Sequence, residues 1–187
     1  MIDYLSGLDQ TLFVFINSQL ANPVTDAVMP VITSDTLLRV LYVATMVLLL
    51  WRGNNRLRWL VLFSIAALVL TDQISAGLLK KWAARPRPCQ ELYGVHLLVN
   101  CGAGFSMPSS HAANAFGQAV LFCVHVRKAL WYLVPIATLI AVSRIFVGVH
   151  YPADVVAGAA LGGGVGFVFA FGLKKWEYWR SRDVVPH

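Results

Sequence analysis

The chain alternates long apolar segments with shorter polar ones. The apolar segments are Leu37–Trp51, Trp59–Leu79, Ala112–Val126, Ala129–Val149 and Val155–Leu173. A helix that crosses the hydrocarbon core of a bilayer needs about 20 apolar residues, with about 17 as the lower limit. The pattern therefore predicts a bundle of membrane-spanning helices, in which the short first and third segments use their polar ends to complete a span.

The residues before Thr36 follow a less regular pattern. Two apolar stretches, 12–16 and 24–32, are interrupted by Asn22-Pro23, Asp26 and Pro30. An interfacial helix followed by a short sixth span fits this pattern, and so does a re-entrant segment. We favour the sixth span. The predicted fold class is an all-α integral membrane protein with about six transmembrane helices and its functional site at one membrane face. Residues 1–187 are expected to form a single membrane-embedded domain.

Composition excludes an ordinary soluble domain. The chain is 58% hydrophobic and only 13% charged, whereas soluble domains carry about 25% charged residues. The formal net charge is +6, which on its own would also suit a nucleic-acid partner. The basic residues flank apolar segments instead of forming a stripe, as membrane anchors do, so we expect the partner to be the lipid bilayer and not nucleic acid.

The basic residues also predict an orientation. If each apolar segment crosses once, the polar segments 80–111 and 143–154 lie on one side of the membrane. The other side then carries 9 of the 15 Lys and Arg residues, namely Arg52, Arg56, Arg58, Arg127, Lys128, Lys174, Lys175, Arg180 and Arg182. Cytoplasmic loops are enriched in Lys and Arg. The two polar segments are therefore expected outside the cytoplasm, and the C-terminus inside.

These two polar segments contain three motifs that suit phosphate binding. The motifs are Lys80-x6-Arg87-Pro88, Pro108-Ser109-Ser110-His111 and Ser143-Arg144-x5-His150-x3-Asp154. The planar guanidinium groups of Arg87 and Arg144 can each bind two phosphate oxygens, and Lys80 adds a compact charge. Ser109 or Ser110 can cap the following helix, whose free N–H groups would then point at the anion.

Two histidines in these motifs suit phosphoryl transfer. A histidine attacks phosphorus through an unprotonated ring nitrogen, while its other nitrogen keeps a proton and donates it to an acceptor. His150 is the candidate nucleophile, and Asp154 is the candidate acceptor in the first turn of a helix that Pro152 would begin. His111 would then protonate the leaving oxygen. One neutral and one protonated imidazole predict a bell-shaped pH profile.

The other polar residues are expected to be structural. The Asp and Glu residues are scattered, so we expect neither a metal site nor a cofactor. We expect Asp72 to pair with Arg39, to orient Lys80 or to lie near the membrane edge. The remaining histidines, which are His96, His125 and His187, receive the same structural interpretation.

Cysteines and glycines add two smaller predictions. Cys123 lies in an apolar run and is expected to be buried. Cys89 and Cys101 share one polar loop and can form a disulfide if that loop faces an oxidising compartment. Gly158, Gly162 and Gly166 recur every four residues, a spacing that lets helices approach closely in lipid.

The three motifs together resemble the type 2 phosphatidic acid phosphatase superfamily, also called lipid phosphate phosphatases. The family pattern is K-x6-RP, PSGH and SR-x5-H-x3-D, and this chain has KKWAARPRP, PSSH and SRIFVGVHYPAD between Lys80 and Asp154. The one departure is Ser110, where the family has glycine. Since serine is also small, we expect the backbone cradle to persist, although with less conformational freedom.

The resemblance implies a six-span bundle and metal-independent dephosphorylation through a phosphohistidine. It implies that His150 is the nucleophile, that Asp154 orients it and that His111 is the general acid. It also implies that Lys80, Arg87, Ser109, Ser110 and Arg144 bind the phosphate of a phosphorylated membrane lipid, Ser110 through its backbone.

Among members of this family, small bacterial proteins with an outward-facing site resemble undecaprenyl-diphosphate phosphatases. This favours undecaprenyl diphosphate as substrate and the bacterial inner (plasma) membrane as location, with the site facing the periplasm or the outside. Phosphatidylglycerophosphate, phosphatidate and lipid A 1-phosphate are alternatives. A non-catalytic phospholipid transporter could use the same cations but needs no His150, Asp154 and His111. The vanadium haloperoxidases share the anion pocket but are soluble, in contrast to this chain.

Overall fold

The chain folds into a helical bundle. The computed structural model describes residues 2–182, and the side chains of residues 6–182. Within these residues there is no strand. The α-helices are α1 (Ile2–Val14), α2 (Pro23–Ile32), α3 (Asp35–Arg52), α4 (Asn55–Asp72), α5 (Lys80–Ala83), α6 (Pro88–Glu91), α7 (Ser110–His125), α8 (Leu130–Phe146) and α9 (Pro152–Arg182), joined by the π-helices η1 (Phe15–Gln19) and η2 (Gln73–Leu79) and the 3-10 turn η3 (Arg127–Ala129).

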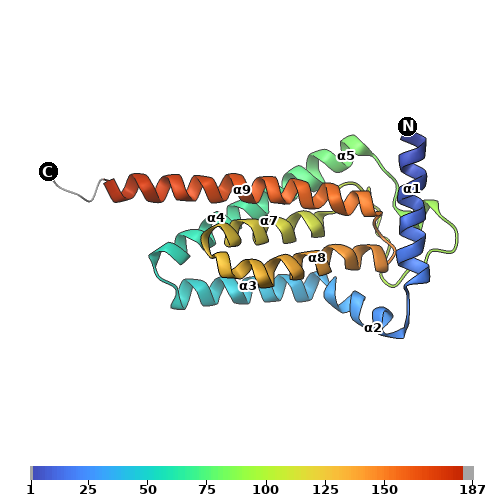
Figure 1. The fold of residues 1–187 in the computed structure, drawn as a ribbon, viewed down its shortest axis with the longest axis horizontal. Coiled ribbons are helices and arrows are strands. Elements are labelled where there is room, and N and C mark those ends of the chain that lie inside the picture. The colour runs from blue at the N-terminus through green and yellow to red at the C-terminus, as the bar shows by residue number, and fades with distance from the viewer. Residues whose placement is uncertain (1, 183–187) are drawn as a thin grey trace.

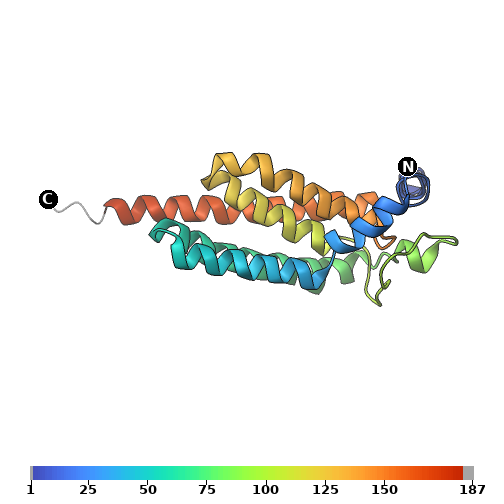
Figure 2. The same cartoon turned by 90° about the horizontal axis from the view of Figure 1, so that it is seen from below.

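Most of the long helices share one direction. Helices α3, α4, α7, α8 and α9 lie along a common axis, whereas α1 lies across one end of the bundle (Figures 1 and 2). The C-terminal part of α9 extends beyond the other end (Figure 1). Short polar residues begin several helices: Asn22 caps α2, Ser34 caps α3 and Asn54 caps α4, each by accepting a hydrogen bond from a first-turn N–H.

The number of spans differs from the sequence prediction. Three helical segments are long and apolar enough to cross a bilayer, and a fourth is found if α2 and α3, which are bent by 50° at their junction, count as one span. Six spans are therefore not confirmed. Helix α7 has 16 residues, about 24 Å of helix, which is shorter than the apolar core. Helix α1 lies across the bundle end, as the interfacial helix considered for the N-terminal residues would lie (Figure 1). The residues expected to form the sixth span, 24–32, lie in α2, whose 10 residues are too few to cross a bilayer alone.

The predicted close approach of helices at the glycines is confirmed. Helices α7 and α9 form the most extensive helix contact in the described residues. A Cβ atom added at Gly162 would lie 1.8 Å from the carbonyl oxygen of Ala113, and one added at Gly166 would lie 2.3 Å from that of Gly117. Backbone therefore packs directly on backbone, which is how small residues join helices in lipid. This contact fixes the relative position of the N-termini of α7 and α9.

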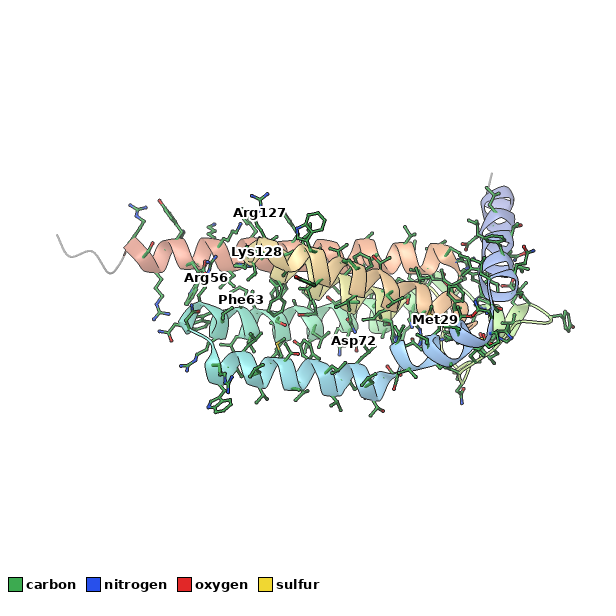
Figure 3. All side chains as sticks on the ribbon, turned by 60° about the horizontal axis from the view of Figure 1, so that its bottom comes forward. Met29, Arg56, Phe63, Asp72, Arg127 and Lys128 are labelled. Atoms are coloured by element: carbon green, nitrogen blue, oxygen red, sulfur yellow. A yellow bond between two sulfur atoms is a disulfide. The ribbon has the colours of Figure 1, made fainter. Side chains whose placement is uncertain are left out.

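A hydrophobic cluster attaches α1 to the same end of the bundle. Phe13 of α1 is buried against Tyr151, with ring centroids 5.4 Å apart, and the cluster includes Ala112, Ile145 and Val155 from α7, α8 and α9. The opposite end carries basic side chains: Arg56, Arg127 and Lys128 lie there, far from Met29 of α2 (Figure 3). The two ends of the bundle are therefore chemically different, and the motif residues gather at the α1 end.

Candidate active site

The N-termini of α7 and α9 meet at this end of the bundle. The backbone N–H of Ser109 donates to the carbonyl oxygen of Asp154 at 2.9 Å. Ser109 is the N-cap residue of α7, but its side chain makes no capping hydrogen bond. Its buried hydroxyl oxygen has no partner among the described residues. The first-turn N–H groups of α7 and this hydroxyl are therefore available to an anion.

Ser110 follows in the first turn of α7. Its hydroxyl lies 2.9 Å from that of Ser75 in η2. The π-helix η2 leads directly into Lys80, the first residue of α5, and such irregular turns are frequent at functional sites. The half-buried Lys80 ammonium makes no ion pair with a carboxylate in the part of the chain that the structure describes.

The two motif arginines are held by backbone and hydroxyl oxygens. The buried Arg144, in the last turn of α8, donates from Nη1 to the Thr33 hydroxyl, while its buried Nε has no partner within residues 6–182. Arg87 donates from Nε to the carbonyl oxygen of Gly104 at 2.8 Å. Neither arginine is paired with a carboxylate among the described residues. Both therefore keep donors for a phosphate.

His150 lies in the buried connection between α8 and α9. The turn after α8 contains Gly148 with φ of +85°, where a Cβ would lie 2.9 Å from Val95 Cγ1. Glycine alone fits this left-handed, crowded position without strain. The connection continues through Val149 and Tyr151, which are both fully buried. The imidazole is thereby fixed against the first turn of α9, which begins at Pro152 as predicted.

The hydrogen bonds around His150 define its tautomer. The Ser106 hydroxyl donates to Oδ2 of Asp154 and lies 3.3 Å from Nδ1 of His150. Because the single hydroxyl proton of Ser106 points at the carboxylate, Nδ1 must be the protonated nitrogen and donate to Ser106 Oγ. Nε2 then carries the lone pair. Asp154 is 3.6 Å from Nδ1, so it holds His150 through Ser106 and not by the direct bond expected from the sequence.

The surroundings also keep His150 neutral. Burial lowers the pKa of His150 to about 3; the negative charge of the nearby Asp154 opposes this, and the positive charges of Arg144 and Arg87 add to it. An imidazole with so low a pKa is uncharged at neutral pH. A neutral ring with a free Nε2 is the form that can attack phosphorus.

His111 faces the turn between α2 and α3. Its Nε2 lies 3.2 Å from the carbonyl oxygen of Thr33 and 3.3 Å from Oδ1 of Asp35. The same Thr33 accepts from Arg144 through its hydroxyl. His111 and Arg144 therefore share one contact residue. Two oxygen acceptors beside Nε2 favour a proton there, as a proton donor requires.

Arg85 is a part of the site that the sequence motifs do not include. Its guanidinium donates to Oδ1 of Asp154 at 2.9 Å and to Oδ2 of Asp9 at 2.6 Å. It also lies 4.0 Å from the centroid of the Tyr151 ring. The sequence motifs also lack three other residues that contact the site, which are Asp9, Thr33 and Ser106. The only sequence signal for Arg85 was its place two residues before Arg87, at a position that the first motif leaves unspecified.

The remaining predicted residues have the following places. Cys89 and Cys101 form a disulfide, with Cα atoms 6.1 Å apart, which settles the pairing that the sequence left open. Cys123 is half-buried, so its predicted burial is wrong in degree, because the chain leaves part of the α7 surface uncovered there. His96 contacts Asp26, and His125 contacts the Leu121 carbonyl; both fit structural roles. His187 lies outside the described residues.

Asp72 has neither of the ion pairs that we considered. Its side chain is exposed at the end of α4, and it pairs with neither Arg39 nor Lys80 within the described residues. No group of three or more His, Cys, Asp or Glu side chains suited to a metal ion is found in the described range.

Taken together, the site combines an anion cradle with two imidazoles. The cradle has cationic side chains from the segment after α4 and from α8, and the free N–H groups of α7. His150 presents an unprotonated Nε2, and His111 in α7 has an Nε2 beside two oxygen acceptors. Such a set can bind a phosphoryl group, attack it and protonate the group that leaves.

Comparisons with known proteins agree with this chemistry. Residues 57–178 match the PAP2 superfamily. The chain is 33% identical to the lipid A 4'-phosphatase of Bacteroides thetaiotaomicron over 94% of this chain and 81% of that protein. It is 34% identical to the undecaprenyl-diphosphatase BcrC of Bacillus subtilis, over 79% of this chain and 75% of that protein. The crystal structure of a PAP2 type phosphatidylglycerolphosphate phosphatase from Bacillus subtilis superposes with a TM-score of 0.74 at 25% identity, over 92% of this chain and 87% of that chain.

Proposed function

The chain belongs to the PAP2 superfamily, and from this premise we propose that it is a metal-independent lipid phosphatase that acts through a phosphohistidine at His150. The observation that carries the proposal is the buried neutral imidazole, whose Nδ1 proton is held by Ser106 and whose Nε2 is free. The buried Nε of Arg144 and hydroxyl of Ser109 have no partner within the described residues. Both groups can bind an anion, which supports the proposal that a phosphoryl group binds beside His150.

The proposed reaction has two steps. Nε2 of His150 attacks phosphorus, and the bond between phosphorus and the leaving oxygen breaks while His111 gives that oxygen a proton. A water molecule then loses a proton to His111 and attacks the phosphohistidine, and the phosphorus–nitrogen bond breaks to release inorganic phosphate. Lys80, Arg87 and Arg144 neutralise the charge on the equatorial oxygens in both steps, with Ser109 and the Ser110 backbone completing the cradle.

Undecaprenyl diphosphate is the proposed substrate, with undecaprenyl phosphate as the product. The identity to the undecaprenyl-diphosphatase BcrC supports this choice. A lipid A phosphate is the second candidate, because the similarity to a lipid A 4'-phosphatase extends over nearly the whole chain. Phosphatidylglycerophosphate is a third, on the likeness to the solved Bacillus subtilis structure, and phosphatidate has the same phosphomonoester chemistry.

The same proposal includes a membrane topology. We place the protein in a bacterial inner (plasma) membrane, with the motif end of the bundle and α1 at the outer or periplasmic surface. Helices α3, α4, α7, α8 and α9 would cross the bilayer, and the C-terminus would be cytoplasmic. The disulfide at the motif end supports an oxidising side, and the basic residues at the other end support a cytoplasmic one. An extracytoplasmic signal from a reporter fused to the C-terminus would reverse this orientation.

Phosphate release from purified protein in detergent tests the activity. The panel of substrates is undecaprenyl diphosphate, lipid A, phosphatidylglycerophosphate and phosphatidate, each assayed with excess EDTA. We expect turnover in EDTA, inhibition by vanadate and an acid-labile ³²P label on wild-type protein that is missing from a His150→Ala variant. Full activity of His150→Ala, or lipid movement without phosphate release, would contradict the proposal.

A further inference from the structure

A chain of three charged side chains connects α1 to the site. The Arg85 guanidinium lies between the carboxylates of Asp9 and Asp154, at 2.6 and 2.9 Å. The Asp154 side chain is fully buried and that of Asp9 is 9% exposed. Buried charges are retained in proteins when they are paired and hydrogen-bonded. Arg85 therefore supplies the partner that keeps Asp154 ionised inside the protein.

Asp9 also reaches the first turn of α9 directly. Its Oδ1 accepts the backbone N–H of Ala153 at 2.8 Å, while its Oδ2 accepts from Arg85. Asp9 shares one face of α1 with Phe13, at a spacing of four residues, and Phe13 is buried in the cluster below the site. On the other face Leu8 and Leu12 are exposed. Helix α1 thus presents a carboxylate inward, next to the residue that orients His150.

The order of charges in this chain has an electrostatic consequence. The Asp154 carboxylate attracts the Nδ1 proton of His150 through the Ser106 hydroxyl, which lies between them. Arg85 alone would neutralise the charge of Asp154 and weaken this attraction. Asp9 compensates the positive charge of Arg85, so that the set of three side chains keeps one net negative charge. A negative charge behind Nδ1–H raises the electron density at Nε2 and stabilises the positive charge that forms on the ring during attack.

We propose that Asp9 and Arg85 are positioning residues for the phosphoryl-transfer reaction, with Asp9 acting through Arg85 on Asp154 and so on His150. The inference rests on the proposed function, because it assigns these residues to the same nucleophile. Neither residue belongs to the proposed anion cradle. Arg85 is engaged by two carboxylates and by the Tyr151 ring, so its donors are directed away from the anion cradle.

A double-mutant cycle separates this role from a structural one. The variants are Asp9→Asn, Arg85→Gln and the double variant, and the matched control is Glu177→Gln, which breaks the exposed Arg56–Glu177 ion pair at the other end of the bundle. We expect Asp9→Asn to lower kcat by about tenfold. A change of this size lies within the range expected when one interaction between contacting residues is lost. KM and the inhibition constant for vanadate should change by less than about twofold, because the anion cradle is intact.

The decisive comparison is the effect of Asp9→Asn with and without Arg85. If Asp9 acts through Arg85, the substitution should lower kcat by less than about twofold in the Arg85→Gln background. An Asp9→Glu variant, which keeps the charge, should recover part of the kcat lost in Asp9→Asn. The rate of ³²P labelling in a single turnover should fall in the same order, from wild type through Asp9→Glu to Asp9→Asn, because the affected step is formation of the phosphohistidine. Glu177→Gln should leave all of these values unchanged.

Three results would overturn the inference. These are an unchanged kcat in Asp9→Asn, an equal loss in both backgrounds, or a loss that follows only the fraction of folded protein, measured by thermal unfolding. Arg85→Gln leaves Asp154 without its ionic partner and can fail to fold. In that case the comparison of kcat between Asp9→Asn and Asp9→Glu, made at equal fractions of folded protein, still tests whether the charge of Asp9 supports the reaction. An active His150→Ala variant would refute the proposed function itself. If His150→Ala is inactive but Asp9→Asn is fully active, only the role of Asp9 and Arg85 is refuted.

Discussion

The Nδ1 atom of His150 lies 3.6 Å from Oδ2 of Asp154, and the Ser106 hydroxyl contacts both groups. Asp154 Oδ2 also accepts the backbone N–H of Tyr151 at 2.8 Å. The carboxylate is therefore held by the residue that follows His150 and by a residue of the loop before α7. This arrangement orients the imidazole through a relay of two hydrogen bonds, and a serine from the loop before α7 becomes part of the proposed catalytic geometry.

Replacing this serine should weaken the reaction without abolishing it. In Ser106→Ala the Nδ1 proton loses its nearest acceptor, while Asp154 remains close enough to approach after a small shift. One hydrogen bond contributes about 1 kcal/mol, so we expect kcat to fall by about fivefold. KM should stay the same, because Ser106 does not belong to the anion cradle. Steady-state kinetics measure both values, with Ser181→Ala, an exposed position near the end of α9, as control. An unchanged kcat would show that Asp154 orients His150 without the relay.

The pH dependence of the reaction should lack the titration near pH 6.5 that an ordinary histidine nucleophile would produce. Burial lowers the pKa of His150 to about 3, so its ring stays neutral as the pH falls through 6.5. A nucleophile with a pKa of 6.5 would lose roughly 25-fold in kcat/KM between pH 7 and pH 5. We expect no loss of that size from His150, measured as the rate of ³²P incorporation and corrected for the titration of the substrate phosphate. A roughly 25-fold loss with a midpoint near 6.5 would contradict the neutral, buried ring.

The same pKa shift determines how acid affects stability. The pKa of His150 is lower in the folded protein than in the unfolded chain, so the unfolded chain binds more protons between these two values. Stability from this group is therefore complete above about pH 6.5 and falls as the pH decreases towards 3. Kinetic measurements at pH 5 need a parallel measurement of the folded fraction, because unfolding would otherwise imitate the titration of the nucleophile.

Much of the site could be predicted from the sequence because its residues stand in short motifs beside apolar runs. A charged residue such as Arg144 inside an apolar segment has few roles other than function. The alternation of polar and apolar segments then assigned the motifs to one side of a bilayer. In the structure the motif residues gather at one end of the bundle, where Ser109 contacts Asp154 across two helices.

The missed residues come from segments with no such signal. Asp9 reaches Ala153 across 144 positions of the chain, and Thr33 reaches Arg144 across 111. Contacts of this kind depend on how α1 and the turn after α2 lie on the bundle end. Hydropathy describes whether a segment is apolar, but not whether it lies along the bundle or across it. For that reason the sequence showed neither that α1 supplies part of the site nor that residues 24–32 form a short helix bent against α3 in place of a separate span.

The disulfide should matter for both stability and phosphate binding. Arg87 lies two residues before Cys89, and its partner Gly104 lies three residues after Cys101. A closed loop of this size stabilises a protein by about 3 kcal/mol in the chain-entropy description. The Cys89→Ala/Cys101→Ala variant should therefore unfold at lower temperature and show a higher KM, because Arg87 loses its fixed orientation. Reductant should have the same effects on wild-type protein and none on the double variant. Cys123→Ala is the control, and a KM that is insensitive to both treatments would separate the loop from phosphate binding.

Gly162 of α9 should be the least replaceable glycine of the bundle. An added Cβ would lie 1.8 Å from the carbonyl oxygen of Ala113, a backbone atom that no change of rotamer can move. Gly162→Ala must therefore separate α7 from α9, at a cost of about 1–3 kcal/mol or more for an overpacked interface. Since the same contact aligns Ser109 with Asp154, kcat should fall together with the unfolding temperature.

The matched control for this substitution lies two residues further along the same helix. A Cβ at Gly164 would meet no atom within 4 Å, and alanine is favoured over glycine in a helix by about 1 kcal/mol. Gly164→Ala should therefore keep full activity and unfold at the same or a slightly higher temperature. Thermal unfolding and kcat of the two variants, measured in one detergent, provide the test. Equal stability of Gly162→Ala and Gly164→Ala would mean that α7 and α9 do not pack backbone to backbone, and the alignment of the two helix N-termini at the site would need another cause.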